Sequence, residues 1–416
     1  MIDASHSATR RGLLRGIAAL PVTALLPAAA RAAAPATSVV DTSGLAVTDD
    51  TVTVGILHSL TGTMALSEVG SVDAENLAIN EINKTGGVLR RQIKVIEADG
   101  ASDWPTFAEK ARLLLANDHC AAVFGCWTSA SRKAALPVFE QYNGLLYYPT
   151  FYEGLEQSKN VIYTGQEATQ QILTALNWLS DVKKAKSFFL VGSDYIWPRT
   201  TNKIARKHIE QHLKGSRVVG EEYYPLGSTE FNTVINKIRL YKPDVIVADV
   251  VGGSNVAFFK QLKASGINLD RQLLMTLATT EDEIRGIGGE NVAGAYASFK
   301  YFQSIETPDN KTFVAAFKKA YGPDSVVGDA TQAAYLGPYL WKEAVEKAGS
   351  FDVDKVVAAS PGIELKNAPE GYVRLHPNHH LWSRSLIGHA RADGQFDIVY
   401  RSPELIEPNP FPKGYQ

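Results

Sequence analysis

The sequence has 416 residues, more than a single hydrophobic core usually supports, so we expect two domains. Its 45% hydrophobic and 21% charged residues are typical of a soluble globular protein. The formal net charge of −2 excludes the basic composition typical of nucleic-acid-binding proteins, so no nucleic-acid partner is predicted.

Residues 1–32 have the pattern of an export signal that is cleaved. The adjacent Arg10 and Arg11 precede an apolar, alanine-rich run over 16–30, which ends in a small-residue cleavage site. Paired arginines favour the twin-arginine route, and an ordinary secretory signal is the alternative. Both routes predict a location in the periplasm. Residues 33–50 are predicted to form a flexible leader.

Strands and helices alternate through the first half of the chain. Short apolar runs predict strands, and apolar stripes at helical spacing predict the helices between them. Such alternation is typical of βαβ units and a parallel sheet. In chain order, we expect strand 51–57, helix 72–83, strand 92–98, helix 107–116, strand 121–125, helix 131–142, strand 145–148 and strand 161–164.

The alternation then restarts, which predicts an α/β fold with two doubly wound parallel-sheet lobes joined by a three-strand hinge. We expect lobe 1 to hold 51–166 and 293–348, lobe 2 to hold 167–292 and 349–402, and 403–416 to form a C-terminal surface tail. In chain order, the second set of elements is helix 170–179, strand 187–191, helix 201–213, strand 217–224, helix 231–240, strand 244–251, helix 255–264, strands 273–277, 292–298 and 301–302, helices 311–321 and 331–347, and short antiparallel strands 372–375, 385–391 and 396–400.

The stretch 124–154 combines a strand, a polar turn, a helix and a second strand, and it predicts a ligand site. Both of its turns fall at the carboxyl edge of a parallel sheet, where open α/β proteins bind ligands. An indole, a phenol and hydroxyls gather there, from Trp127, Tyr148 and the nearby Ser and Thr residues. A second aromatic turn, with Tyr195 and Trp197, follows the first strand of the second series. We therefore expect a small, neutral, polar ligand in a cleft between the lobes.

Some residue patterns in the sequence could indicate catalysis, and each has a simpler interpretation. Ser129 with Arg132 and Lys133 offers a nucleophile beside basic groups, but no Gly-x-Ser-x-Gly turn surrounds it. Capping of the following helix by Ser129 or Ser131 is the simpler interpretation. The glycine pairs lack the spacing and the Lys-Ser/Thr of a phosphate-binding loop. The sequence therefore predicts no catalytic residue and no cofactor.

Histidine and cysteine spacing also predicts no metal site. His376, His379 and His380 are close enough to share a metal ion, but no cysteine or carboxylate lies beside them to complete the set. They are interpreted as turn histidines. Cys120 and Cys126 lie about 20 Å apart if they share one strand, too far for a disulfide. Both are expected to be buried free thiols.

Four carboxylates lie near the predicted mouths of the cleft. A donor group on a polar ligand would need an acceptor, and a nearby carboxylate or backbone carbonyl could supply it. The sequence does not show which carboxylate contacts the ligand, and the candidates are Glu68, Glu153, Asp194 and Glu281.

Several blocks in order resemble the urea and short-chain-amide branch of the type I periplasmic binding proteins, from about residue 53 to 412. That branch contains the urea-binding subunit of an ABC transporter and a cytoplasmic amide sensor, and the sequence shares motifs with each. The blocks are Gly125-Cys126-Trp127-Thr128-Ser129, Tyr148-Pro149, Tyr152-Glu153-Gly154, Asp194-Tyr195-x-Trp197-Pro198-Arg199, Tyr301-Phe302-Gln303-Ser304, Asn378-His379-His380 and Asp393-Gly394-Gln395-Phe396.

The resemblance implies an exported receptor that delivers a small neutral polar ligand, urea or a short amide, to an ABC permease in the inner membrane. The alternatives are an amide-sensing regulator, an amidase and a receptor for branched-chain amino acids. Glu68 is added to the implied pocket as a carboxylate candidate. Residues that match the pocket of the amide sensor are Trp127, Ser129, Tyr148, Thr150, Phe151, Tyr195, Trp197 and Val251.

Overall fold

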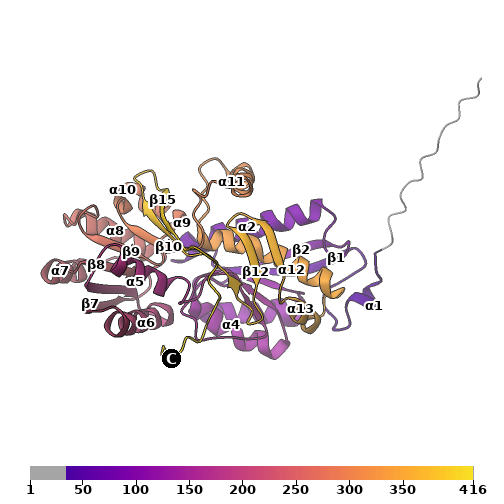
Figure 1. Cartoon of the computed structure of the whole chain (residues 1–416). Helices are drawn as coiled ribbons and strands as arrows, with labels where there is room; N and C mark the ends of the chain where they lie inside the picture. The colour runs from indigo at the N-terminus through magenta and orange to yellow at the C-terminus, as the bar shows by residue number, and fades with distance from the viewer. Residues whose placement is uncertain (1–33, 416) are drawn as a thin grey trace, which may run out of the picture. The chain divides into compact units, whose positions relative to one another are not determined.

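The computed structural model describes residues 34–415 (Figure 1). The predicted export signal, residues 1–32, lies outside the described residues. Between residues 34 and 415, no helix combines the length and the apolar character needed to cross a membrane. The described chain forms an α/β fold with two lobes, each built on its own sheet, as predicted.

Lobe 1 is built on a five-stranded sheet in the order β2-β1-β3-β4-β5. All of its strand pairs are parallel. β1 is almost wholly buried because helices cover both faces of the sheet, which explains its nearly continuous apolar sequence. The strands are β1 (Thr51–His58), β2 (Gln92–Asp99), β3 (Val123–Gly125), β4 (Leu146–Tyr148) and β5 (Val161–Tyr163).

The helices of lobe 1 come from two distant parts of the chain. The long helices α2 and α12 pack against each other, and α12 also contacts β3 and β4. Figure 1 shows α12, coloured orange, beside the indigo α2. The helices are α2 (Ala65–Lys84), α3 (Trp104–Arg112) with a π-helical turn (Leu113–Asn117), α4 (Ser129–Tyr142), α11 (Pro308–Tyr321), α12 (Asp329–Ala348) and α13 (Val353–Ala359).

Lobe 2 is built on a seven-stranded sheet in the order β15-β14-β10-β9-β8-β6-β7. The strands from β10 to β7 run parallel, whereas β14 and β15 pair antiparallel at the other end. The strands are β6 (Ser187–Ser193), β7 (Arg217–Tyr224), β8 (Val245–Asp249), β9 (Leu273–Thr276), β10 (Tyr296–Phe299), β14 (Leu386–Ala390) and β15 (Phe396–Arg401). The helices of lobe 2 are α5 (Ile172–Asp181), α6 (Ile196–His212), α7 (Asn232–Tyr241), α8 (Gly253–Ala264), α9 (Glu281–Ile287) and α10 (Gly289–Val292).

The chain passes between the lobes three times, after β5, after β10 and before β14, as the predicted hinge requires. The boundaries differ from the predicted ones in two places. Residues 293–299 were expected in lobe 1, but β10 pairs with β9 in the sheet of lobe 2. Residues 301–302 follow β10 as irregular chain rather than as a strand.

Residues 353–382 were expected in lobe 2, and the structure places them on lobe 1. Their buried side chains, among them Val356 and Val373, share one apolar core with Val54 of β1. α13 packs against α12, so the chain folds back onto lobe 1 before it crosses for the last time. A separate three-stranded sheet forms here from β11 (Glu364–Ala368), β12 (Gly371–Leu375) and β13 (Leu381–Trp382).

The prediction of a flexible leader is wrong for residues 34–50. The short helix α1 (Thr37–Val40) buries Val40, and Val47 bridges to β1. The Arg91 guanidinium donates a hydrogen bond to the carbonyl of Pro35 at 2.7 Å. The segment is ordered because its few apolar residues and its backbone have partners in lobe 1, which polar composition alone does not reveal.

The C-terminal tail runs along the surface and contacts both lobes. The carbonyl of Pro410 accepts a hydrogen bond from the N–H of Leu155 at 2.7 Å. The Tyr415 hydroxyl lies 2.6 Å from a ring nitrogen of His208 on α6. The tail therefore spans the two lobes on the outside of the fold.

Candidate functional site

The polar turn after β3 brings the first site residues to the carboxyl edge of the lobe 1 sheet. Gly125 has φ 143°, and a β-carbon there would lie 2.1 Å from the Leu57 carbonyl oxygen, so only glycine fits. Cys126 follows in the left-handed region with φ 58°, a conformation that costs about 1–2 kcal/mol for a residue with a side chain. This sharp turn sends the chain from β3 directly into Trp127.

Thr128, rather than Ser129 or Ser131, caps helix α4, so the predicted capping residues were wrong. The Thr128 hydroxyl oxygen accepts a hydrogen bond from the Ser131 N–H at 3.0 Å. Because the cap is already supplied, Ser129 is free to turn elsewhere. Its hydroxyl donates to Oε2 of Glu153 at 2.5 Å.

Aromatic rings from the two lobes meet at this edge. Phe151 follows β4 in lobe 1, and its ring centroid lies 5.6 Å from that of Trp127 and 5.4 Å from that of Trp197 at the start of α6. Tyr195 lies beside Trp197, with centroids 6.4 Å apart. The predicted residues of the two lobes are therefore brought together into one buried aromatic group.

Glycine permits the close packing behind this group. A β-carbon on Gly165 would lie 2.2 Å from the carbonyl carbon of Thr150 and 2.5 Å from the nitrogen of Phe151. Any larger residue would push Thr150 and Phe151 out of place. Gly165 is a residue of the site that the sequence did not single out, although it stands directly after a predicted strand.

Arg132 is buried and its guanidinium contacts several residues of lobe 1, although its Nη2 has no hydrogen-bond partner within the described residues. Its guanidinium lies over the Tyr148 ring, 4.5 Å from the centroid. It donates to Glu156 at 2.6 Å and to the Ser129 hydroxyl oxygen at 3.3 Å, and it lies 3.7 Å from Glu153. Burial acts to raise the pKa of Glu156, but the nearby Arg132 and Lys133 charges outweigh it and lower the pKa to about 2. The positive charge of Arg132 is thus balanced inside the protein.

The phenols of the site are neutral. Burial raises the pKa of Tyr148 and of Tyr195 well above its usual value, and the charge of Glu153 acts in the same direction on both. The Tyr148 hydroxyl donates to the carbonyl of Trp127 at 2.7 Å, which leaves its oxygen as an acceptor.

Several buried polar atoms of this edge have no hydrogen-bond partner within residues 34–415. The set contains indole N–H donors, a hydroxyl and a carboxylate oxygen, so it includes both hydrogen-bond donors and hydrogen-bond acceptors without a partner. The atoms are Nε1 of Trp127, Nε1 of Trp197, Oγ1 of Thr150 and Oε1 of Glu153. Leaving such a group unpaired costs about 1–3 kcal/mol, so this set is suited to a polar ligand.

Val251 and Glu68 complete the predicted residues, and each is already committed to internal contacts. Val251 is buried just after β8, and its N–H donates to the Ser193 hydroxyl at 3.1 Å. Glu68 lies in the first turn of α2, where Oε2 accepts from the Ser59 N–H at 2.6 Å and lies 3.4 Å from Nδ1 of His58. Glu68 therefore forms part of a buried cluster with His58 behind the aromatic group.

The other candidate carboxylates differ sharply in position. Glu153 joins the site, as its bond to Ser129 shows. Asp194 lies at the surface and forms an ion pair with Arg199 at 2.5 Å. Glu281 is buried at the start of α9, where its Oε1 accepts from the Gln303 N–H at 2.8 Å.

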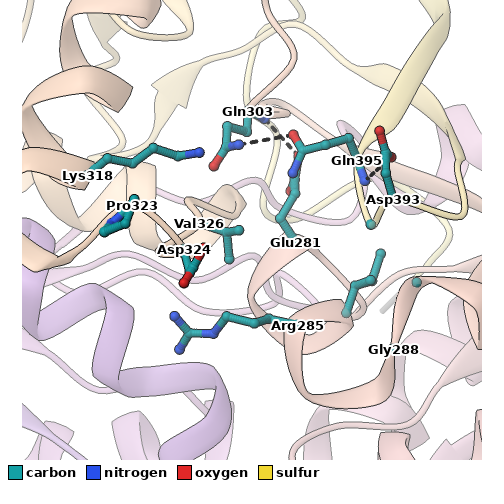
Figure 2. A pocket seen from close by; sticks show the side chains of 13 residues that line it. Glu281, Arg285, Gly288, Gln303, Lys318, Pro323, Asp324, Val326, Asp393 and Gln395 are labelled. Carbon is teal, nitrogen blue, oxygen red and sulfur yellow. Dashed lines mark hydrogen bonds between the residues drawn. The ribbon is translucent and has the colours of Figure 1, made fainter.

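Glu281 lines a different cavity of about 470 Å³, between α9, the β14–β15 hairpin and the segment after α11. Figure 2 shows Glu281 beside Gln303 and Gln395, with Arg285, Lys318 and Asp324 around the opening. Its lining contains none of the predicted aromatic residues. The aromatic edge is the better candidate site because it combines the predicted rings with open donors and acceptors.

The three predicted turn histidines have separate protein partners. His380 stacks on Tyr163 with centroids 4.3 Å apart and lies 2.6 Å from the Tyr152 hydroxyl. His376 pairs with Glu407, and His379 contacts the carbonyl of Ser158. In the described part of the chain, no group of three His, Cys, Asp or Glu side chains could hold a metal ion. Cys120 and Cys126 are buried free thiols, and burial raises the pKa of both.

Asp249 is a further buried polar residue, at the carboxyl end of β8 in the lobe 2 sheet, and it was not among the predicted site residues. It is the last residue of β8, it is fully buried, and both of its carboxyl oxygens lack a partner within the described residues. An acidic residue that ends an otherwise apolar strand was the signal that could have identified it.

Comparison with known proteins shows that the chain matches one protein family over most of its length. The family description "Periplasmic binding protein domain" matches residues 52–416 of the chain. A solved solute-binding protein of an ABC transporter from R. palustris, in complex with 4-hydroxybenzoate, has a TM-score of 0.77 at 21% identity, over 86% of this chain and 98% of that chain. At that identity the likeness shows the fold alone.

Two relatives illustrate how the chain compares in sequence. Leu/Ile/Val-binding protein homolog 7 of Brucella melitensis is 24% identical over 385 residues, which cover 88% of this chain and 95% of that protein. A limonene hydroxylase of Geobacillus stearothermophilus is 36% identical, but only over 124 residues, or 30% of this chain. The chain spans 23% of the length of that protein, so its named activity does not carry over.

Proposed function

The chain belongs to the periplasmic binding protein family, and we propose that its solute is urea or a short-chain aliphatic amide, bound between the two lobes. The observation that carries this proposal is the set of open hydrogen-bonding atoms at the aromatic edge. Nε1 of Trp127 and Oγ1 of Thr150 can donate to a carbonyl oxygen, whereas Oε1 of Glu153 can accept from an amide N–H. Urea and simple amides carry both kinds of group on one small planar frame.

The ring walls suit a planar ligand of this size. Trp127, Phe151 and Trp197 surround the edge with apolar faces, and flat groups pack well against such faces. Ser129 is turned toward Glu153 and so serves to orient the carboxylate that receives the amide nitrogen. Trp127 and Phe151 belong to lobe 1 and Trp197 to lobe 2, so the ligand would favour closure of the lobes around it.

The charge balance favours a neutral ligand over a free amino acid. An amino acid would need a cation for its carboxylate, and the charge of the buried cation at this edge, Arg132, is already balanced by Glu156 at 2.6 Å and Glu153 at 3.7 Å, although its Nη2 has no hydrogen-bond partner within the described residues. A receptor for branched-chain amino acids is the second candidate, because a Leu/Ile/Val-binding protein homolog aligns along most of the chain. The carboxylate of that ligand would have to compete with Glu153 and Glu156 for the Arg132 charge.

The expected partner is an ABC permease in the inner membrane, and the expected location of the receptor is the periplasm. Both follow from membership of a family of exported solute receptors. A permease would contact the surfaces of the two lobes in the closed arrangement, so transport would depend on the ligand.

Calorimetry of the purified protein decides between the candidate ligands. We expect saturable binding of urea, formamide, acetamide or propionamide, and no binding of leucine, isoleucine or 4-hydroxybenzoate. Ammonia is measured in the same samples, because its release would indicate an amidase. Tight binding of leucine together with no response to any amide would overturn the proposed ligand class while leaving the receptor role in place.

A further inference from the structure

The cavity of about 470 Å³ that Glu281 lines is separate from the aromatic edge and takes its walls from both lobes. α9 and the β14–β15 hairpin belong to lobe 2, whereas Lys318 of α11 and the segment 323–326 belong to lobe 1. The volume is within the range of about 300–1,000 Å³ that small-molecule sites have. A small molecule bound here would therefore contact both lobes at a place distinct from the proposed solute site.

Glu281 brings a buried carboxyl group to the wall of this cavity. The residue is 1% exposed, and its Oε1 accepts a hydrogen bond from the Gln303 N–H at 2.8 Å. Its Oε2 has no hydrogen-bond partner within residues 34–415. A buried carboxyl oxygen without a donor is costly, and a donor held in the cavity would satisfy it.

Hydrogen bonds across the lobes hold the surroundings of this carboxyl in place. Oε1 of Gln303 accepts from the Val327 N–H at 2.8 Å, and Nε2 of Gln303 donates to Oε1 of Gln395 at 3.1 Å. Asp282 of α9 accepts from the Gly328 N–H, just before α12, at 2.9 Å. Figure 2 shows Gln303 and Gln395 close to Glu281. Because these groups are already fixed, a ligand would not have to order them.

Two cations stand at the opening of the cavity. Figure 2 shows Arg285 of α9 and Lys318 of α11 there, with Asp324 at the same opening. In the described part of the chain, neither cation forms an ion pair or a side-chain hydrogen bond. Asp393, which also lines the cavity, pairs with Arg391 instead. The cavity thus combines an open carboxyl oxygen in its wall with two open cations at its mouth.

This combination of charges favours one class of ligand. A metal ion would be repelled by Arg285 and Lys318, and no group of three His, Cys, Asp or Glu side chains in the described chain could hold one. A simple anion offers no donor to Oε2 of Glu281, whereas an ammonium group does. Burial raises the pKa of Glu281, and an ammonium group beside it would act in the opposite direction.

We propose that this cavity binds a small zwitterion, whose ammonium group donates to Oε2 of Glu281 and whose carboxylate pairs with Arg285 and Lys318. Guanidinium and ammonium groups are the usual partners of a carboxylate. Because the ligand would contact α9 and α11 together, it would link lobe 2 to lobe 1. The inference does not depend on which solute binds at the aromatic edge.

The class of ligand is tested by calorimetry of the purified protein with glycine, β-alanine and 4-aminobutyrate. These zwitterions differ in the separation of their two charges, and we expect saturable binding of at least one of them. Propionate and ethylamine each carry only one of the charges, so they should bind at least about tenfold more weakly. Equal binding by either single-charge compound, or no binding by any zwitterion, would overturn the inference.

Glu281→Gln tests the ammonium contact. Glutamine keeps the shape of the side chain and can still accept from the Gln303 N–H, but it carries no negative charge. Affinity for the tightest-binding zwitterion should therefore fall at least about tenfold, and unchanged affinity would contradict the proposed contact. Glu283→Gln is the matched control, because Glu283 is equally buried on α9 but bonds to Thr280 and does not line the cavity.

Arg285→Gln tests the carboxylate contact at an exposed position, where a substitution disturbs folding least. Loss of this cation should weaken zwitterion binding by about threefold or more. Arg239→Gln, at an exposed position of α7 outside the cavity, is the control and should leave affinity unchanged. Equal affinities of these two variants would exclude Arg285 from the site. Thermal unfolding of each variant checks that it folds.

Binding of acetamide separates this inference from the proposed function. The Glu281→Gln protein should bind acetamide as the unaltered protein does. Loss of zwitterion binding in Trp127→Phe, with none in Glu281→Gln, would place the zwitterion at the aromatic edge and overturn the inference. If the unaltered protein bound a zwitterion but no amide, the proposed solute would be wrong while the second site remained.

Discussion

At the scale of single residues, the site depends on which hydrogen-bonding atoms the protein leaves open. The Ser129 hydroxyl donates its hydrogen bond to Glu153, and the Tyr148 hydroxyl donates its hydrogen bond to the Trp127 carbonyl. The indole N–H of Trp127 and the hydroxyl of Thr150 remain without partners in the described chain. Burial makes each open atom costly, and a ligand that satisfies it recovers that cost.

The indole N–H of Trp127 can be tested apart from its ring. Trp127→Phe keeps an aromatic wall against Phe151 and removes the donor, so we expect amide affinity to fall about tenfold, or about 1.4 kcal/mol. Trp341→Phe is the control, because Trp341 is equally buried in the core of lobe 1 but packs against Phe124 and Phe351. Calorimetry should show a change for the first variant alone, and equal affinities would remove Trp127 from the donors.

At the scale of elements, the turn before α8 connects lobe 2 to lobe 1. The Gly253 N–H donates to the Thr63 carbonyl at 3.0 Å, across the two lobes. Gly252 has φ 59°, and a β-carbon there would lie 2.8 Å from the Thr63 carbonyl oxygen. Glycines in this turn therefore let the backbones of the two lobes approach closely.

Closure can be perturbed at this contact without touching the ligand. A β-carbon on Gly253 would meet Thr63 Oγ1 at 3.1 Å and nothing else beyond the Thr63 backbone, so Gly253→Ala should disfavour the closed arrangement. We expect a loss of about 1 kcal/mol, or about fivefold in affinity, measured by calorimetry with the tightest-binding amide.

The compensating change is made on the opposite lobe. Thr63→Ala removes the hydroxyl that the new β-carbon meets, so the double variant should recover most of the affinity. A Gly253→Ala protein that binds as well as the unaltered one would show that this contact does not limit closure.

At the scale of the whole molecule, a buried charge cluster in lobe 1 ties stability to pH. His58 lies 3.1 Å from Glu75 and 3.4 Å from Glu68, and all three side chains are buried. Burial lowers the pKa of His58, but the two glutamates outweigh it and raise the pKa to about 9. His58 is therefore charged in the folded protein at neutral pH.

The sign of the resulting pH dependence follows from the raised pKa. The contribution of His58 is fully present below its unfolded pKa of 6.5 and is lost as pH rises toward about 9. We expect the free energy of unfolding to fall by roughly 3 kcal/mol over that range, measured by chemical denaturation. His58→Asn should lower stability and flatten this dependence. The exposed His119→Asn should keep it, and equal pH slopes in all three proteins would exclude His58 as the cause.

Much of the fold was predictable because strand and helix periods are local properties of the sequence. The strand at β7 was predicted over its full extent, 217–224, and helix α4 within two residues of its start. The assignment of segments to lobes was less successful: β10 joined lobe 2, and 353–382 joined lobe 1. Which sheet a segment joins depends on distant partners, and local periodicity carries no information about them.

The sequence by itself determined the alternating α/β architecture and the aromatic and hydroxyl residues at the sheet edges, because both follow from local patterns. Only the tertiary structure decided how those residues are used. It balanced Arg132 with Glu153 and Glu156, left Asp249 without a partner and ordered residues 34–50. Protonation and hydrogen bonding depend on burial among residues far apart in the chain, and folding alone brings those residues together.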